Sequence, residues 1–134
     1  MREILFRGKC IDGSGWVEGF YREYKMPLCW QHEAQQDGIN YFIDEKDSNT
    51  SNYVLPETVG QYTGLKDSNG KRIFEGDILK EKCHNILFLV EWSDESLCYF
   101  IKTLKGGRDY LCDIWDRDVI GNRWDNPELL EVQS

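Results

Sequence analysis

The sequence predicts an all-β, or strongly β-weighted, fold built on an antiparallel meander that can curl into a small barrel. The first observation is compositional: the 134 residues include one alanine, Ala34, but five tryptophans, seven tyrosines and six phenylalanines. Aromatic and β-branched residues favour strands, whereas helices are rich in alanine and leucine. The second is spacing, because short apolar segments recur about every 10 to 15 residues with turn residues between them. Connections this short favour antiparallel neighbours.

The N-terminal half is predicted to contain three strands. Arg2–Arg7 and Gly15–Arg22 flank a turn at Asp12-Gly13-Ser14, and Ile39–Ile43 is the third strand. Asp44–Asn52 contains no apolar residue, so we expect a solvated loop there and the least order in the chain.

The C-terminal half is predicted to form the meander itself. The expected strands are Lys71–Glu81 with Gly76 inside it, Ile86–Trp92, Leu97–Leu104, Tyr110–Trp115 and Val119–Trp124. Ser93–Ser96 and Gly106-Gly107 mark two of the turns. A short helix of one or two turns is expected to begin at Asn126-Pro127-Glu128. These residues supply an N-cap residue, a proline at the first helical position and an acidic residue in the first turn. Its residues Leu129 and Leu130 are expected to close an end of the barrel rather than bind a partner.

Length and composition favour one domain over residues 1–134, with a less regular part at about 1–57 and a barrel part at about 58–134. No apolar segment approaches the ~18 residues of a membrane span, and no signal segment is visible. The five cysteines lack CxxC spacing and indicate free thiols in a reducing cytoplasm, where Cys98 and Cys112 are expected to pack as small hydrophobes. His84 directly follows Cys83, and His32 has no second ligand nearby, so we expect no metal and no cofactor.

The net charge constrains the partners. Sixteen basic against 24 acidic residues give −8, and neither half is basic. Nucleic-acid backbones and anionic membranes attract basic surfaces, so both are disfavoured as partners. A negative surface would instead attract a basic partner.

The least generic segment is Gln61–Leu79, QYTGLKDSNGKRIFEGDIL. Asn69-Gly70 is a strong hairpin signal, and we expect a type I′ turn that pairs Tyr62–Leu65 with Arg72–Phe74. Gly76 indicates a bulge or a close approach by another group. Glu75 and Asp77 beside it have two interpretations, a metal or general-base site and acids that accept hydrogen bonds from turn amides. The second interpretation is favoured, because no histidine or third carboxylate accompanies the pair.

This segment resembles the core motif of the YopX family of small phage and prophage proteins of Gram-positive bacteria. Phe6-Arg7-Gly8-Lys9, Trp16 with Gly19, Val119–Asn122 and Asn126–Leu130 also agree with that family. The resemblance implies an SH3-like roll and a phage-derived protein in a bacterial cytoplasm, and it implies no activity. The matching motif residues, for which structural roles are expected, are Tyr62, Thr63, Gly64, Leu65, Asp67, Gly70, Glu75, Gly76, Asp77 and Ile78.

Two further groups have a structural and a functional interpretation. Asp109, Asp113, Asp116 and Asp118 lack calcium-loop spacing, and we expect a solvated turn with ion pairs to Arg108 and Arg117. The aromatic residues Tyr99, Trp115 and Trp124 could stack on bases, but core packing is favoured.

Three functions are compatible with these features. The leading hypothesis is a non-catalytic protein-interaction module that binds a host or phage protein and self-associates, because strand edges and exposed aromatic residues invite symmetric pairing. The second is a role in nucleic-acid transactions, through direct binding or acidic mimicry of nucleic acid. The third is a metal-dependent enzyme that uses Glu75 and Asp77, with His84 as a further candidate. We predict no catalytic residues.

Overall fold

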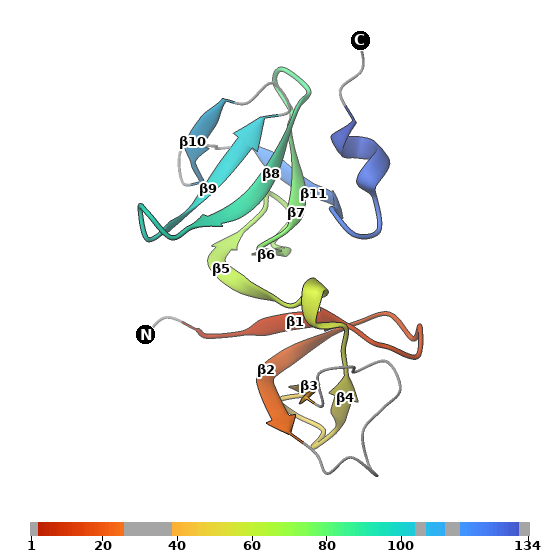
Figure 1. The fold of residues 1–134 in the computed structure, drawn as a ribbon. Helices are drawn as coiled ribbons and strands as arrows, with labels where there is room; N and C mark the ends of the chain where they lie inside the picture. The colour runs from red at the N-terminus through yellow and green to blue at the C-terminus, as the bar shows by residue number, and fades with distance from the viewer. Residues whose placement is uncertain (1–2, 26–38, 104–106, 112–115, 132–134) are drawn as a thin grey trace. The chain divides into compact units, whose positions relative to one another are not determined.

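A computed structural model describes residues 3–25, 39–103, 107–111 and 116–131. The described chain consists of antiparallel strands and two short 3-10 turns, so the all-β prediction is confirmed (Figure 1). It divides into two compact units, Met1–Gln61 and Tyr62–Ser134. No helix among these residues has the length and apolar content needed to cross a membrane.

The first unit is an antiparallel sheet of the order β4-β3-β2-β1-β5, to which β5 contributes its first two residues. Its strands are β1 (Phe6–Lys9), β2 (Trp16–Lys25), β3 (Ile39–Asp44), β4 (Ser51–Tyr53) and the start of β5 (Gly60–Lys66). A 3-10 turn, η2 (Pro56–Thr58), precedes β5. A bridge between Cys10, just after β1, and Val54, just after β4, also brings the ends of these two strands together.

The second unit begins with a hairpin of the remainder of β5 and β6 (Arg72–Phe74). A five-stranded sheet follows, in the order β10-β9-β8-β7-β11. Its strands are β7 (Asp77–Glu81), β8 (Ile86–Ser93), β9 (Cys98–Thr103), β10 (Arg108–Tyr110) and β11 (Arg117–Asn122). Strands β7 to β10 pair in chain order, which confirms the predicted meander, and β11 returns to pair with the free side of β7.

One face of this sheet and the hairpin enclose the core of the second unit. The cluster consists of Ile73, Leu79, Phe88, Val90, Ile101 and Leu111, with Leu65, Tyr99 and Val119 packed against it. The hairpin residue Ile73 belongs to the same cluster as the sheet residues, so the unit is a two-layered roll. Tyr99 takes the core-packing role expected of it, whereas Trp115 and Cys112 lie outside the described residues.

Three predicted segments differ in the structure. Lys71–Glu81 is two strands, β6 and β7, because a turn at Glu75 and Gly76 sends them to different partners. The predicted loop Asp44–Asn52 ends early, since Ser51 and Asn52 pair with β3. A strand ladder uses backbone groups, so an apolar side chain is not required there. Of the predicted strand Tyr110–Trp115, only Tyr110 is in β10, and residues 112–115 lie outside the described chain.

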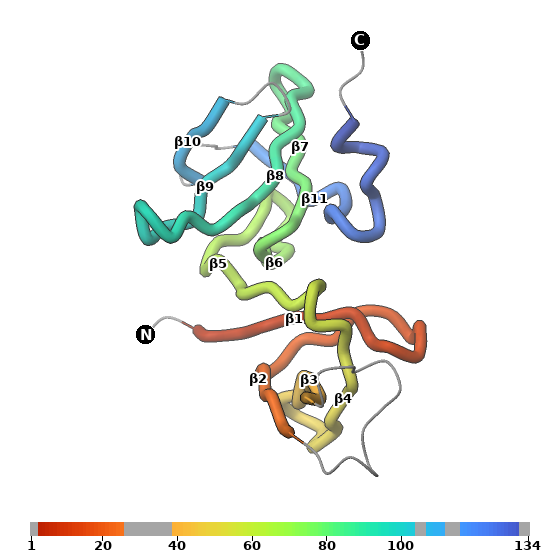
Figure 2. Tube along the Cα trace, viewed as in Figure 1, coloured from red at the N-terminus to blue at the C-terminus, as the bar shows by residue number. Residues whose placement is uncertain are grey.

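The predicted C-terminal helix is a single 3-10 turn, η4 (Pro127–Leu130). Asn126 does not cap it; its Oδ1 instead accepts a hydrogen bond from the amide of Asn122 at 3.2 Å. The side chain therefore closes the preceding turn, whose course is visible in Figure 2. Leu130 lines a small pocket with Leu89, Lys102 and Thr103, so η4 rests on the five-stranded sheet.

Candidate functional site

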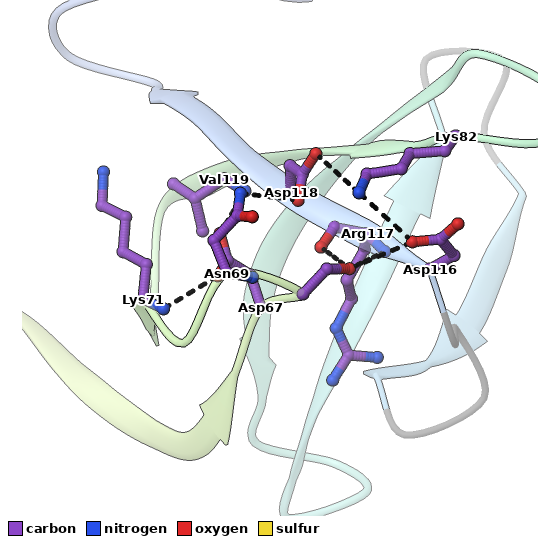
Figure 3. Close-up of polar contacts among 9 residues, drawn as sticks. Asp67, Asn69, Lys71, Lys82, Asp116, Arg117, Asp118 and Val119 are labelled. Carbon is purple, nitrogen blue, oxygen red and sulfur yellow. Dashed lines mark hydrogen bonds and ion pairs between the residues drawn. The ribbon is translucent and has the colours of Figure 1, made fainter.

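The carboxylate of Asp67 lies at the centre of the motif and is buried. Its Oδ1 accepts hydrogen bonds from the amides of Asn69 (2.9 Å) and Lys71 (2.8 Å). Its Oδ2 accepts a third, at 3.0 Å, from the amide of Val119 in β11, 52 residues away (Figure 3). One side chain thus holds the turn after β5 in shape and attaches that turn to the edge strand of the sheet.

Ser68 adds a second attachment to β11 beside Asp67. Its amide donates to the carbonyl of Arg117 at 2.9 Å, and its Oγ accepts from the amide of Arg117 at 3.0 Å. The Arg117 guanidinium is itself buried and donates to the carbonyl of Leu111 at 2.9 Å. We call Asp67, Ser68, Arg117 and Val119 the β11 clamp.

The clamp explains why the predicted type I′ turn is wrong. Gly70 has a positive φ of 83°, but Asn69 is not among the residues with positive φ. The amide of Gly70 donates to the carbonyl of Asp67 at 3.0 Å, and the amide of Asp67 donates to the carbonyl of Lys71 at 2.8 Å. These bonds describe a β-turn followed by a glycine bulge, which leaves the Asp67 carboxylate free to accept amides two and four residues ahead.

The clamp predicts loss of stability in acid. Burial alone raises the pKa of Asp67, but the hydrogen bonds from Val119, Lys71 and Asn69, with the charge of Lys71, hold this pKa below its ordinary value. A carboxylate with a lowered folded-state pKa stabilises the fold above its unfolded-state pKa of about 3.9, and this contribution disappears as pH falls through the folded-state pKa. We expect urea unfolding free energies to decrease below about pH 4.

The comparison with Asp67→Asn isolates this group, because Asp44 and Asp12 also have lowered pKa values. The variant should show a shallower decline in unfolding free energy over the same acidic range. Equal slopes in the two proteins would contradict the assignment.

An ionic network lies on the solvent side of the clamp. Lys82 Nζ lies 3.5 Å from an oxygen of Asp116 and 3.4 Å from one of Asp118, and Asp116 and then Asp118 raise its pKa. Asp118 also accepts a hydrogen bond from the Asn69 side chain at 3.1 Å. Asp116 and Asp118 therefore both form ion pairs with Lys82, and the guanidinium of Arg117 donates a hydrogen bond to the carbonyl of Leu111. Asp113 lies outside the described residues.

The first residues of the motif shape β5. Between the pairs Tyr62 with Phe74 and Lys66 with Arg72, three residues of β5 face a single residue of β6. Gly64, with φ of 90°, allows this bulge. Thr63 closes it, because its hydroxyl donates to the carbonyl of Ile73 at 2.8 Å and accepts from the amide of Leu65 at 3.2 Å.

The last residues of the motif form the turn between β6 and β7. Gly76 has φ of 91°, and a Cβ there would lie 2.4 Å from ring atoms of Trp124. Asp77 is buried, and its Oδ2 accepts the amide of Phe74 at 2.8 Å. Ile78, fully buried, follows in β7. The close approach expected at Gly76 is therefore the Trp124 ring, and Asp77 binds a turn amide.

The third hypothesis needs Glu75 and Asp77 to meet a substrate or metal ion. Asp77 is 1% exposed, and His84 is an exposed residue whose Nδ1 lies 3.1 Å from Glu81 rather than beside the motif. Within the described ranges, no group of three or more His, Cys, Asp or Glu residues is placed to hold a metal ion. Cys29 and His32 lie outside those ranges.

Sequence reasoning missed the partners of the motif. Arg117, Val119 and Trp124 supply the contacts of Asp67, Ser68 and Gly76, and they lie about 50 residues further along the chain. No local pattern marks them, because strand pairing and packing bring them to the motif.

Comparisons with known proteins identify relatives by family and by fold. The family model described as "YopX protein" matches residues 16–131. The solved structure titled "Crystal structure of protein EF1440 from Enterococcus faecalis" is similar, with a TM-score of 0.55 and 24% sequence identity over 98% of this chain and 100% of that chain. At this identity the likeness extends to the fold alone. A search of curated proteins finds no match.

Proposed function

The chain belongs to the YopX family, and from that premise we propose that it is a non-catalytic protein-interaction module that self-associates. We further propose a phage-derived role in the bacterial cytoplasm. The described cysteines Cys10, Cys83 and Cys98 are free, which supports a reducing compartment. The motif supports the non-catalytic part, because Thr63, Asp67 and Asp77 all bind backbone groups of their own unit.

Leu97, in the turn between β8 and β9, carries the proposal. It is 73% exposed and has a positive φ of 54°. A left-handed conformation costs a non-glycine residue about 1 to 2 kcal/mol, and turns at such positions favour glycine or asparagine. An exposed leucine in a strained conformation brings the isolated molecule no visible benefit. Burial of the leucine side chain in a contact with another molecule would supply a favourable free energy that offsets the conformational cost.

The surroundings of Leu97 suit a second copy. Trp92 is 40% exposed, pairs in register with Tyr99 and packs edge-on against it with ring centroids 4.9 Å apart. Two hairpin tips related by a two-fold axis would place each Leu97 against the partner's Trp92, which is a self-complementary contact. Both tips also carry the exposed acids Asp94 and Glu95, which oppose association at low salt.

We expect Leu97→Gly to weaken self-association at least about tenfold, because each copy loses a buried leucine side chain. The same change should raise the unfolding free energy of the monomer by about 1 kcal/mol, since glycine accepts a positive φ. Sedimentation velocity from low to high micromolar protein, with urea unfolding of dilute samples, measures both effects.

Ile86→Thr is the matched control, because Ile86 is an exposed apolar residue at the opposite end of β8. It should leave self-association unchanged. Association of the natural sequence should strengthen from 0.05 to 0.5 M NaCl as the acidic tips are screened, whereas binding to nucleic acid would weaken. A strict monomer at high micromolar concentration would refute the self-association.

A further inference from the structure

A pocket lies on the face of the five-stranded sheet that is opposite the core. Residue pairing defines that face: Phe100 pairs with Glu91 and Tyr110, whereas the neighbouring Ile101 pairs with the core residue Val90. The pocket has a volume of about 240 Å³. It is lined by Ser93, Ser96, Cys98, Phe100, Arg108, Asp109 and Tyr110. Cys98, which was expected to pack as a small hydrophobe, is half-buried at this pocket and is not a member of the core cluster.

Arg108 gives the pocket a positive group in a chain of net charge −8. Its guanidinium carbon lies 4.7 Å from the centroid of the Phe100 ring, which is only 8% exposed. No carboxylate of the described residues forms an ion pair with it. Stacking on a buried ring fixes the plane of the guanidinium and leaves its N–H edge available for a carboxylate.

The strand that carries Arg108 is an edge of the described sheet. β10 pairs with β9 on one side and is the last strand in the order β10-β9-β8-β7-β11. All three of its residues are exposed, and Tyr110 is 62% exposed. An edge strand offers backbone N–H and C=O groups to an added strand.

We propose that β10 accepts an extended peptide segment of a partner protein by strand addition, with a carboxylate of that peptide on Arg108. This inference rests on the proposed interaction function and names a partner class for it. The pocket volume favours a peptide, because small-molecule sites usually occupy about 300 to 1,000 Å³ and 240 Å³ accommodates one side chain. In strand addition, backbone hydrogen bonds supply affinity and such pockets select alternate side chains.

A second copy of this chain fits β10 poorly. In an antiparallel pair centred on the middle residue, the two Asp109 side chains lie directly opposite each other. Like charges at directly opposed positions are destabilising. The occupant is therefore a different, acidic segment. Self-association through Leu97 uses the β8–β9 turn, which borders the pocket but does not include β10.

The test uses the full chain and two capped heptapeptides of alternating threonine and valine, with a central glutamate in one and glutamine in the other. We expect the glutamate peptide to bind at least about tenfold more tightly by calorimetry, because a carboxylate–guanidinium bond is charge-assisted. Arg108→Gln should abolish this preference. N-methylation of alternate amides in the glutamate peptide should remove binding, since strand hydrogen bonds need those N–H groups.

Arg22→Gln is the matched control. Arg22 also stacks on a phenylalanine, 4.3 Å from the centroid of Phe42, but it already pairs with Asp44 at 2.9 Å. Its replacement should leave the peptide preference unchanged. Equal binding of the two peptides, no binding of either, or displacement of the glutamate peptide by millimolar inorganic phosphate would overturn the inference. Sedimentation of Arg108→Gln separates the two proposals, because self-association through Leu97 should persist in that variant.

Discussion

Replacing Asp67 with alanine should lower the free energy of unfolding by about 3 kcal/mol, because buried amides that lose their acceptor each cost about 1 to 3 kcal/mol. All three amides that donate to Asp67, those of Asn69, Lys71 and Val119, form partly buried bonds. Asp67→Asn keeps one carbonyl acceptor and should lose about half as much. Urea unfolding at pH 7 measures these changes.

Asp118→Ala is the control for the Asp67 variants. Asp118 accepts a hydrogen bond from Asn69 and lies 3.4 Å from Lys82, and it is more exposed than Asp67. Pairs of this kind contribute about 0 to 1 kcal/mol. If Asp67→Ala and Asp118→Ala destabilise the protein equally, the β11 clamp does not hold the hairpin to the sheet.

Replacing Gly76 with alanine should lower the free energy of unfolding by about 3 to 4 kcal/mol, through two separate effects. The positive φ of 91° costs a side chain about 1 to 2 kcal/mol. The added Cβ also overlaps the Trp124 ring at 2.4 Å, and overpacking costs about 1 to 3 kcal/mol. The backbone cannot easily move away, because Gly76 bonds to Val90 and Arg123 through its amide and carbonyl.

Gly64→Ala separates the two effects at Gly76. Gly64 has nearly the same φ, 90°, but a Cβ there meets nothing within 4 Å. Its replacement should cost only about 1 to 2 kcal/mol. Trp124→Leu should recover part of the Gly76→Ala loss in the double variant. Equal losses at Gly64 and Gly76 would show that the Trp124 ring is not a constraint.

The contacts of Asp67 and Gly76 are part of a pattern that explains which residue types the motif contains. Gly64, Gly70 and Gly76 each provide a positive φ, while Asp67 and Asp77 each bind backbone amides. The motif therefore specifies a bulge, a turn and a tight crossing between β6 and β7. The match over residues 16–131 confirms the family membership that the resemblance implied. That membership is consistent with this architecture and assigns no activity.

The sequence predicted those features that depend on neighbours along the chain. The spacing of short apolar segments and the turn residues between them identified the meander from β7 to β9, and the Asn69-Gly70 signal located the β5–β6 hairpin. The type I′ turn predicted for that hairpin was wrong, because Asn69 does not have the positive φ that this turn requires. The amide of Asn69 instead donates to the Asp67 carboxylate. The short strand β4 was missed, since its residues Ser51 and Asn52 carry no apolar signal.

By itself, then, the sequence determined the all-β class, the positions of most strands and the need for glycine at position 76, because each follows from local side-chain chemistry. Only the tertiary structure decided which partners those residues meet. Asp67 reaches Val119 across 52 residues, and Trp124 covers Gly76. It also decided that Arg108 stacks on Phe100 at the edge of the sheet formed by the described strands. Contacts of this kind depend on which strands pair and pack, and residue alternation along one strand carries no information about a partner fifty residues away.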